Sequence, residues 1–242
     1  MDLGKFLSIL DKGKLYFARL DQLSEFDPFE GYYTHLNLNP DKLDEDMPEE
    51  WRVSVEGRTF TAMIRSKLKE VVKHHRTMTF VNSWHIKEYE SAAMWKVYLS
   101  NNEGIAIQST YQRLVDSLAG YEDFEVYIGR IKYIDFRREA IPGWNLISPF
   151  VYKRKSFEYE DELRALIWTP QRGKNHMLDP NQNKYRDILG LDVTTNLDVL
   201  VEKIYVSPSA PDWIGDTVRS VTARYGLTKE VVRSDLAEGP LY

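Results

Sequence analysis

The sequence predicts an α+β fold: a single domain over residues 1–242, with a mixed, largely antiparallel sheet core and flanking helices. Three observations support this prediction. Segments with helical and with strand periodicity are interleaved along the chain, the candidate strands partly alternate in polarity instead of being solidly apolar, and no repeat or flexible linker divides the sequence. A length of 242 residues with 43% hydrophobic content is enough for a substantial core.

The N-terminal segment predicts a helix followed by a strand. Leucine and phenylalanine recur at helical spacing over residues 3–10, Asp2 suits the N-cap, and Gly13 suits the end of the helix. Residues 14–20 alternate in polarity as a strand does, which places Arg19 near the end of the first strand.

Two polar stretches are expected to be loops. Residues 21–50 carry turn signals, and their acidic part, 37–50, is expected to lie in solvent. Residues 172–184 are polar and rich in asparagine, and they are expected to form a second loop.

The other periodic segments alternate between helix and strand. In chain order they are helix 58–75, strand 77–83, helix 90–100, strand 104–109, helix 111–120, strand 124–134, strand 162–168, strand 197–208, helix 210–226 and strand 229–234. In helix 90–100, Ala93, Met94, Val97 and Tyr98 are expected to face inward.

Composition limits the functional classes. The chain has no cysteine, which excludes disulfides, thiolate catalysis and cysteine-based zinc sites. Its net charge of −5 argues against coating nucleic acid through bulk positive charge. Signal-peptide features and membrane-length apolar runs are missing, so a cytoplasmic protein without membrane contact is expected. Glycine-rich phosphate loops, HExxH and GxSxG are also absent.

Four carboxylates crowd the entrance of strand 162–168. They are Glu158, Glu160, Asp161 and Glu162. On an extended chain, Glu160, Glu162 and Arg164 share one face. One interpretation is that Arg164 neutralises the two glutamates in a charged rim on an edge strand. The other is that the two glutamates form a binding or catalytic element.

The element Glu160-Asp161-Glu162 resembles the last motif of the arginine–serine–glutamate ADP-ribosyltransferases, which use NAD. The resemblance implies that Glu162 hydrogen-bonds the nicotinamide ribose and stabilises the oxocarbenium-like state as nicotinamide leaves. It implies that Glu160 orients or activates the acceptor. Under this hypothesis NAD is the co-substrate, no metal is expected, and the acceptor is left open among protein, nucleic acid and small molecule.

The two other elements of that motif set have counterparts here in the same order. Arg19 is suited to grip a pyrophosphate bidentately, and the Ser83 hydroxyl is suited to hold the glutamate or the ribose. Trp84 or Tyr89 would stack on nicotinamide or adenine. The sequence departs from the family pattern at the middle motif, which reads Asn82-Ser83-Trp84 and lacks Ser-Thr-Ser.

A second resemblance covers nearly the whole chain. It is to a bacterial family catalogued only as domain of unknown function 2971, and it implies no function. The segments that carry it are KLYFARLDQLSEFDPFEG (14–31), FVNSWH (80–85), ESAAMWKVY (90–98), GIAI (104–107), FEYEDELR (157–164) and VEKIYVSP (201–208).

The segment DPFEG (27–31) supports a different enzyme hypothesis. If Asp27 and Glu30 line the same cleft as Glu160 and Glu162, the four carboxylates suit Mg²⁺ or Mn²⁺, as in a divalent-metal nuclease or phosphohydrolase. The plainer interpretation is an Asp-capped turn with Phe29 packed inward.

A third hypothesis is a non-catalytic ligand-binding or sensor domain, in which the acidic groups form only a charged rim. The basic run Lys153-Arg154-Lys155 is expected at the surface, where either enzyme hypothesis could use it to hold phosphate. Among the enzyme hypotheses, the ADP-ribosyltransferase-like one leads, and whether the protein is an enzyme stays open.

Overall fold

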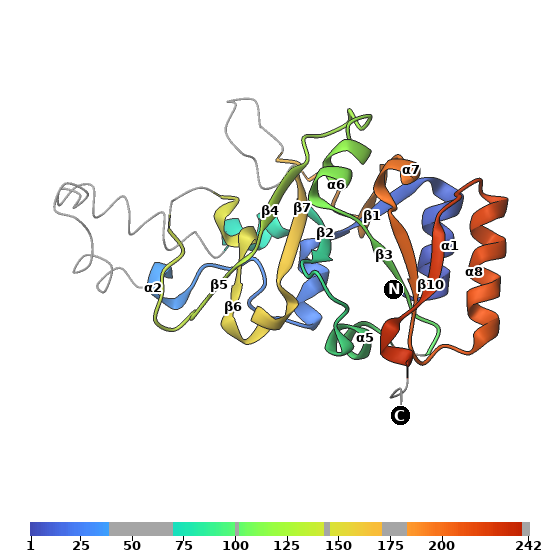
Figure 1. The fold of residues 1–242 in the computed structure, drawn as a ribbon. Coiled ribbons are helices and arrows are strands. Elements are labelled where there is room, and N and C mark those ends of the chain that lie inside the picture. Colours follow the sequence, from blue (N-terminus) through green and yellow to red (C-terminus); the bar gives the residue numbers. More distant parts are fainter. Residues whose placement is uncertain (39–69, 100–101, 143–145, 171–182, 239–242) are drawn as a thin grey trace, which may run out of the picture. The chain divides into compact units, whose positions relative to one another are not determined.

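The computed structural model describes residues 1–38, 70–99, 102–142, 146–170 and 183–238, and it confirms an α+β architecture (Figure 1). Contacts within the chain divide it into two compact units built from interleaved segments. Unit 1 comprises Met1–Tyr16, Lys87–Asp123 and Asp192–Tyr242, and unit 2 comprises Phe17–Ile86 and Phe124–Leu191.

Most of a five-stranded sheet belongs to unit 2. Its strand order is β4 (Tyr127–Arg130), β7 (Glu162–Trp168), β2 (Thr79–His85), β1 (Lys14–Arg19) and β8 (Gly190–Thr194). β7 pairs antiparallel with both β4 and β2, and β2 pairs antiparallel with β1. β7 is therefore an inner strand, so the interpretation of its charges as the rim of an edge strand is wrong.

A short parallel ladder of β5 (Lys132–Ile134) and β6 (Tyr152–Arg154) accompanies this sheet. The strand predicted over 124–134 is split at Ile131, whose N–H donates to the Glu162 carbonyl at 2.8 Å. The chain thus leaves β7 at that residue and pairs with β6 instead. The 3₁₀ helices η3 (Ser148–Val151) and η4 (Lys155–Glu160) flank β6 on either side along the chain.

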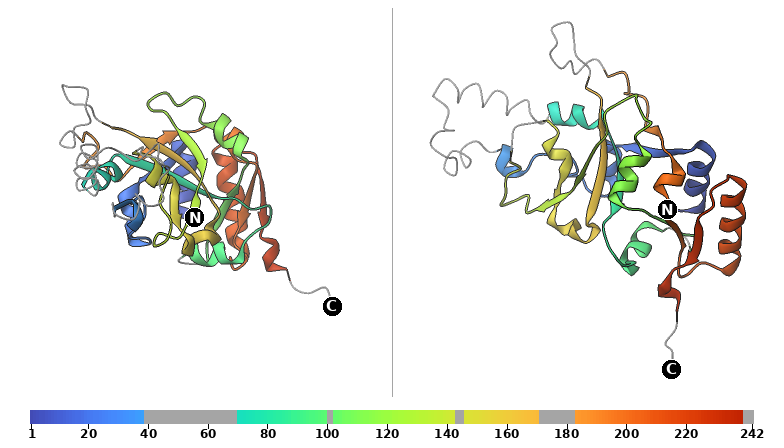
Figure 2. Two further views of the ribbon diagram at one scale, coloured as in Figure 1. Left: turned by 90° about the vertical axis from the view of Figure 1, so that its left-hand side faces the viewer. Right: turned by 45° about the horizontal axis from the view of Figure 1, so that its top comes forward.

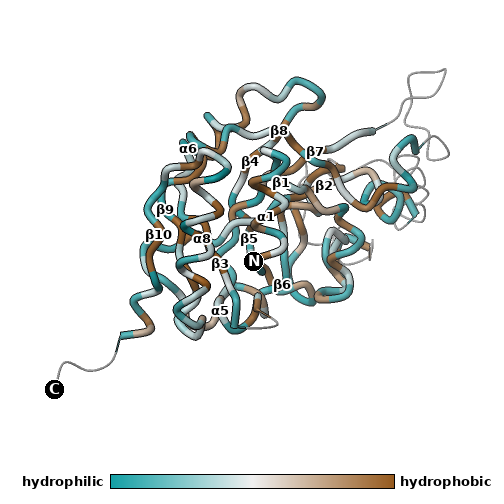
Figure 3. Tube along the Cα trace, turned by 90° about the vertical axis from the view of Figure 1, so that its right-hand side faces the viewer, coloured by the Kyte–Doolittle hydropathy of each residue, from teal (hydrophilic) through white to brown (hydrophobic). Residues whose placement is uncertain are grey.

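The core of unit 2 lies against the β2–β7 pair. Leu20, Val81, Phe150 and Leu166 form one buried cluster, and hydrophobic residues recur along β2 and β7 (Figure 3). β-branched and aromatic residues suit such inner strands, which is why the sequence pattern located them correctly.

Unit 1 is built on the order β10–β9–β3, with β3 (Ile105–Gln108) antiparallel and β10 (Glu230–Arg233) parallel to β9 (Lys203–Val206). The helix α8 (Asp212–Arg224) connects the parallel strands and lies alongside β10 (Figure 2). Ile204 and Val206 of β9 pack with Ile214 and Val218 of α8 and with Phe6 of the N-terminal helix.

The remaining helices of unit 1 are short, apart from α1 (Leu3–Lys12). They are α5 (Ala92–Tyr98), α6 (Tyr111–Ser117) and α7 (Leu197–Leu200). The α1 prediction is confirmed in detail: the Asp2 carboxylate accepts from the Lys5 N–H, and Gly13 ends the helix in the left-handed region.

Further predictions of secondary structure or burial are wrong. The strand expected over 197–208 begins as α7, because the Asn196 side chain caps that helix by accepting from the Val199 N–H at 3.2 Å. Helix α5 has no buried residue, and Ala93, Val97 and Tyr98 are exposed while Met94 is half-buried. β8 was not predicted at all.

The predicted loops lie partly outside the described residues. Of the loop expected over 21–50, the structure describes η1 (Leu20–Glu25) and α2 (His35–Leu38), whereas residues 39–50 fall outside. Residues 171–182 fall outside as well, and so does most of the helix expected over 58–75. Among the described residues, no helix combines the length and apolarity that crossing a membrane requires.

His75 provides a test of core packing in unit 2. It is buried, and the Trp168 Nε1–H donates to its Nδ1 at 3.0 Å, so the ring must be neutral. Burial, followed by the charge of neighbouring His74, lowers the pKa of His75 from 6.5 to about 4. Between these pH values the unfolded chain binds a proton that the native protein does not, so stability falls as pH falls.

We therefore expect the free energy of unfolding to drop by up to about 1.4 kcal/mol per pH unit between pH 6.5 and 4 from this residue. Denaturant unfolding across that range should show a shallower slope for His75→Gln. The matched change at exposed His35, His35→Gln, should keep the wild-type slope. Equal slopes for all three proteins would contradict the assignment.

Candidate functional site

Arg164 lies at the centre of a buried group of charges in unit 2. Its side chain is fully buried, and each terminal nitrogen has a partner. Nε and Nη2 donate to Glu162 Oε1 and Oε2 at 2.6 and 3.1 Å, and Nη1 donates to Glu30 Oε1 at 2.7 Å and to the Phe150 carbonyl at 2.9 Å. Burial alone would lower the pKa of Arg164, but Glu162 and Glu30 raise it above its ordinary value.

Lys153 brings a third carboxylate into the group. Its Nζ lies 2.5 Å from Glu160 Oε2 and 3.4 Å from an oxygen of both Glu162 and Glu30. Burial opposes the charge of Lys153, but the neighbouring carboxylates raise its pKa. We call Glu30, Lys153, Glu160, Glu162 and Arg164 the ion cluster. Lys153 is buried in it, so its predicted place on the surface is wrong.

An unusual backbone conformation at Asp161 sets the two glutamates of the ion cluster against Lys153. Glu160 ends η4, Glu162 begins β7, and Asp161 between them is left-handed, with φ of 38°. That conformation costs a non-glycine residue about 1–2 kcal/mol. The Asp161 carboxylate accepts from Arg130 Nη2 at 2.5 Å, which helps to hold the kink. Glu160 is thus off the strand, contrary to expectation.

The turn formed by DPFEG (27–31) directs the Glu30 side chain into the protein interior. Asp27 Oδ1 accepts from the Phe29 N–H at 2.9 Å, which confirms the Asp-capped turn. Gly31 has φ of 74°, and a Cβ there would lie 2.8 Å from Leu20 Cδ2, so glycine is required. Phe29 is about half exposed, which corrects the expectation that it packs inward.

Ser83 and Tyr133 fix Glu162 from two sides. β2–β7 pairing places Ser83 opposite Arg164, and the Ser83 hydroxyl donates to Glu162 Oε1 at 2.5 Å. The Tyr133 hydroxyl accepts from the Glu162 N–H at 2.9 Å. Burial raises the pKa of Tyr133 to about 12, so it stays a neutral phenol.

His85 lies at the Glu160 side of the ion cluster. Its Nδ1 is 2.5 Å from the Glu160 carbonyl oxygen. Because a carbonyl oxygen can only accept, Nδ1 must carry the proton. In the neutral ring, Nε2 is then a bare acceptor; it is buried, and no described residue offers it a hydrogen bond.

The surroundings shift the two glutamate pKa values in opposite directions. Burial raises the pKa of Glu160 above its ordinary value, although the hydrogen bond and charge of Lys153 act against this. Burial would also raise the pKa of Glu162, but Arg164, Lys153 and Ser83 together lower it. Two nearby carboxyls with diverging pKa values are the arrangement that separates an acid–base group from a permanent anion.

Arg19 does not join this group. It lies opposite Phe80 in the β1–β2 ladder, and Phe80 and Ser83 project from opposite faces of the sheet because faces alternate along a strand. Its Nε donates to Asp21 at 2.7 Å, and its Nη1 donates to the Arg186 and Ile188 carbonyls at 2.6 and 2.9 Å.

Neither candidate stacking residue joins it either. Trp84 projects from the face opposite Ser83, and its Nε1 donates to Asn82 Oδ1 at 2.6 Å. Tyr89 is highly exposed and belongs to unit 1. Of the predicted site residues, the structure therefore brings together Ser83, Glu160 and Glu162.

Three of the four carboxylates of the metal hypothesis lie close together, and the fourth does not join them. Glu30, Glu160 and Glu162 do converge, but on the ammonium of Lys153, and Asp27 pairs with Arg154 Nη2 at 2.6 Å. Within the part of the chain that the structure describes, no three histidine or carboxylate side chains are arranged to hold a metal ion. The metal-dependent hydrolase stays an alternative hypothesis with less geometric support.

Two residues of the site could not be identified from the sequence. Lys153 sits in a basic run, and its burial depends on carboxylate partners from other segments. Tyr133 is one of fifteen tyrosines in the chain and carries no distinguishing signal. Comparison with protein-family models, with curated proteins and with solved structures finds no match to this chain. Both resemblances drawn from the sequence therefore stay predictions.

Lys153→Met tests whether Lys153 stabilises the folded protein by neutralising the carboxylates of the ion cluster. Losing one partner of a buried ion cluster should lower the free energy of unfolding by about 3–5 kcal/mol at pH 7. The matched change at its exposed neighbour, Lys155→Met, should cost less than about 0.5 kcal/mol. Denaturant unfolding of both variants measures this. In Lys153→Met, part of the lost free energy of unfolding should be recovered towards pH 5, because a buried carboxylate without its cation takes up a proton. Similar small losses in both variants would refute the assignment.

Proposed function

We propose that the protein transfers the ADP-ribosyl group of NAD to an acceptor, with Glu162 and Glu160 acting at the glycosidic bond. The observation that carries this proposal is the arrangement of Ser83, Glu160 and Glu162. Ser83 is hydrogen-bonded to Glu162, both glutamates contact Lys153, and their pKa values are shifted in opposite directions.

The proposed chemistry assigns a different task to each glutamate. The C1′–N bond of NAD breaks, nicotinamide leaves with the electron pair, and positive charge develops on the ribose. The Glu162 carboxylate, kept ionised by Arg164, stabilises that charge. An acceptor hydroxyl then gives an electron pair to C1′ and its proton to Glu160, whose raised pKa suits it as a general base. With water as the acceptor, the product is ADP-ribose.

A second candidate function is a non-catalytic ligand-binding or sensor domain. The observation that favours it is the completeness of the ion cluster: Glu162 is only 4% exposed, and Arg164 donates to both of its oxygens. Buried ion groups of this kind also serve to specify one packing arrangement of a fold.

Nicotinamide release tests the first candidate. NAD labelled in the nicotinamide ring is incubated with the protein and a cell extract as the acceptor source, with and without EDTA, and release is followed by mass spectrometry. We expect release that is insensitive to EDTA. Glu162→Gln should lower its rate on the order of 10²–10³-fold, and Glu160→Gln should slow transfer about 10²-fold.

Glu158→Gln is the matched control, since Glu158 is exposed in the same segment and its side chain stands outside the ion cluster; its rate should equal that of the wild type. Thermal unfolding of each variant confirms that the folded protein is being assayed. Absence of release from folded wild-type protein would contradict the transferase proposal and favour the second candidate.

A further inference from the structure

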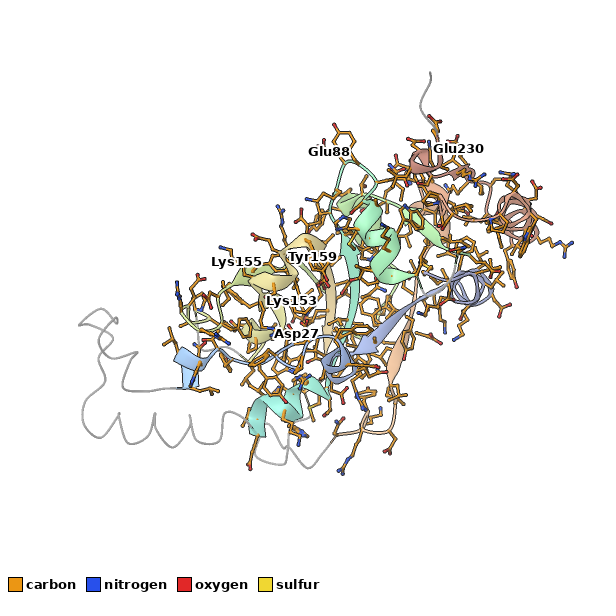
Figure 4. The ribbon with its side chains drawn as sticks, turned by 90° about the horizontal axis from the view of Figure 1, so that it is seen from below. Asp27, Glu88, Lys153, Lys155, Tyr159 and Glu230 are labelled. Carbon is orange, nitrogen blue, oxygen red and sulfur yellow. The ribbon has the colours of Figure 1, made fainter. Side chains whose placement is uncertain are left out.

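Arg154 is a partly exposed cation next to Lys153 of the ion cluster in sequence. It follows Lys153 in β6, and its side chain is 30% exposed, whereas those of Glu30, Lys153 and Glu162 are each 9% exposed or less. Figure 4 shows Lys153 on β6, Lys155 and Tyr159 on η4, and Asp27 nearby. Arg154 and exposed Lys155 are therefore accessible to a ligand from solvent, whereas every member of the ion cluster is buried.

Aromatic rings frame the Arg154 guanidinium. Its central carbon lies 4.7 Å from the centroid of the Phe29 ring and 5.3 Å from that of Phe157. Phe157 also lies 5.0 Å from Lys153 Nζ and contacts the ring of half-exposed Tyr159. Phe157 therefore connects the exposed surface directly to the ion cluster, and the rings offer planar faces on which a flat ligand can stack.

Arg154 has hydrogen-bonding capacity left over. One bond joins its Nη2 to Asp27 Oδ1, but its Nε is buried and no described residue accepts from it. Asp27 is itself 1% exposed, and its Oδ2 lacks a partner among the described residues. The buried Nε does not face solvent, but the Arg154 side chain is 30% exposed. A partly exposed guanidinium beside an exposed lysine and aromatic rings has the chemistry that binds phosphate attached to a flat ring.

We propose that Arg154, Lys155 and the rings of Phe157 and Tyr159 bind the diphosphate and base of a nucleotide. Arg154 and Lys155 contact the diphosphate, and the rings stack on the base. The sequence suggested that Arg19 binds the pyrophosphate, but Arg19 is hydrogen-bonded to Asp21 and to two backbone carbonyls on the face of the sheet opposite Ser83. The proposal assigns pyrophosphate binding to Arg154 and Lys155 instead. The inference rests on the proposed function, since it names the part of NAD that is held while the ribose reacts.

ADP-ribose is the probe, because it carries the diphosphate and the base but no nicotinamide to release. Binding to the full chain is measured by isothermal titration calorimetry at low and at high salt. We expect Arg154→Gln to weaken binding about tenfold or more, and Lys155→Gln and Phe157→Leu to weaken it severalfold. Affinity should fall as salt rises, and Arg154→Gln should reduce this dependence.

Arg138→Gln is the matched control, because Arg138 is a highly exposed arginine of unit 2 that pairs with Asp135 at 3.8 Å. Its affinity for ADP-ribose should equal that of the wild type. Arg154→Lys keeps a cation opposite Asp27 and protects folding; it should still bind less tightly, because an ammonium lacks the fork. Adenosine, which has no phosphate, should bind equally to the wild type and to Arg154→Gln.

The outcomes separate this inference from the proposed function. Binding of ADP-ribose that is unchanged in Arg154→Gln, or no binding by the wild type, overturns the inference whatever the rate of nicotinamide release. Binding that depends on Arg154, with no nicotinamide release from NAD, supports the inference and removes the transferase proposal. A nucleotide-binding domain without catalysis would then remain.

Discussion

The structure of unit 2 depends on one buried arginine. Arg164 sits in an inner strand where water cannot solvate its charge, so the fold must supply acceptors for it. It does so from Glu162, two residues along the same strand, and from Glu30, which lies 134 positions away in sequence. The turn that ends at Gly31 positions Glu30, and the 3₁₀ helix η3 supplies the Phe150 carbonyl as a further acceptor.

The same interaction gives the site its chemistry. Arg164 holds Glu162 as an anion, and a second cation, Lys153, is needed because Glu30 and Glu160 bring further negative charge into the same space. Burial keeps the pKa of Glu160 raised, although Lys153 Nζ lies only 2.5 Å from its carboxylate. The ion cluster, which compensates the buried charge of Arg164, therefore contains one permanent anion, Glu162, and one carboxyl that can exchange a proton, Glu160. His85 lies beside Glu160.

The sequence predicted the elements whose signals are local. The cap at Asp2, the glycine end of the first helix and the apolar run of β7 each depend on a few adjacent residues, and each was identified correctly. The link between Ser83 and Glu162 was also anticipated, although β2 continues past Ser83 to His85, beyond the strand end predicted at residue 83. The face of the sheet from which Arg19 projects was not anticipated, because it depends on the register of the β1–β2 ladder. Lys153 was misjudged for a related reason: burial of a charge is decided by distant partners, which no local pattern reveals.

The central claim is that Arg164 and Lys153 divide the two glutamates into an anion and a proton acceptor. The most direct test is a carbon-detected NMR titration of the glutamate side-chain carboxyls, assigned with Glu160→Gln and Glu162→Gln. The account predicts that Glu160 titrates above the ordinary value of 4.5 and Glu162 below it. Titration of both carboxyls together near 4.5 would contradict it.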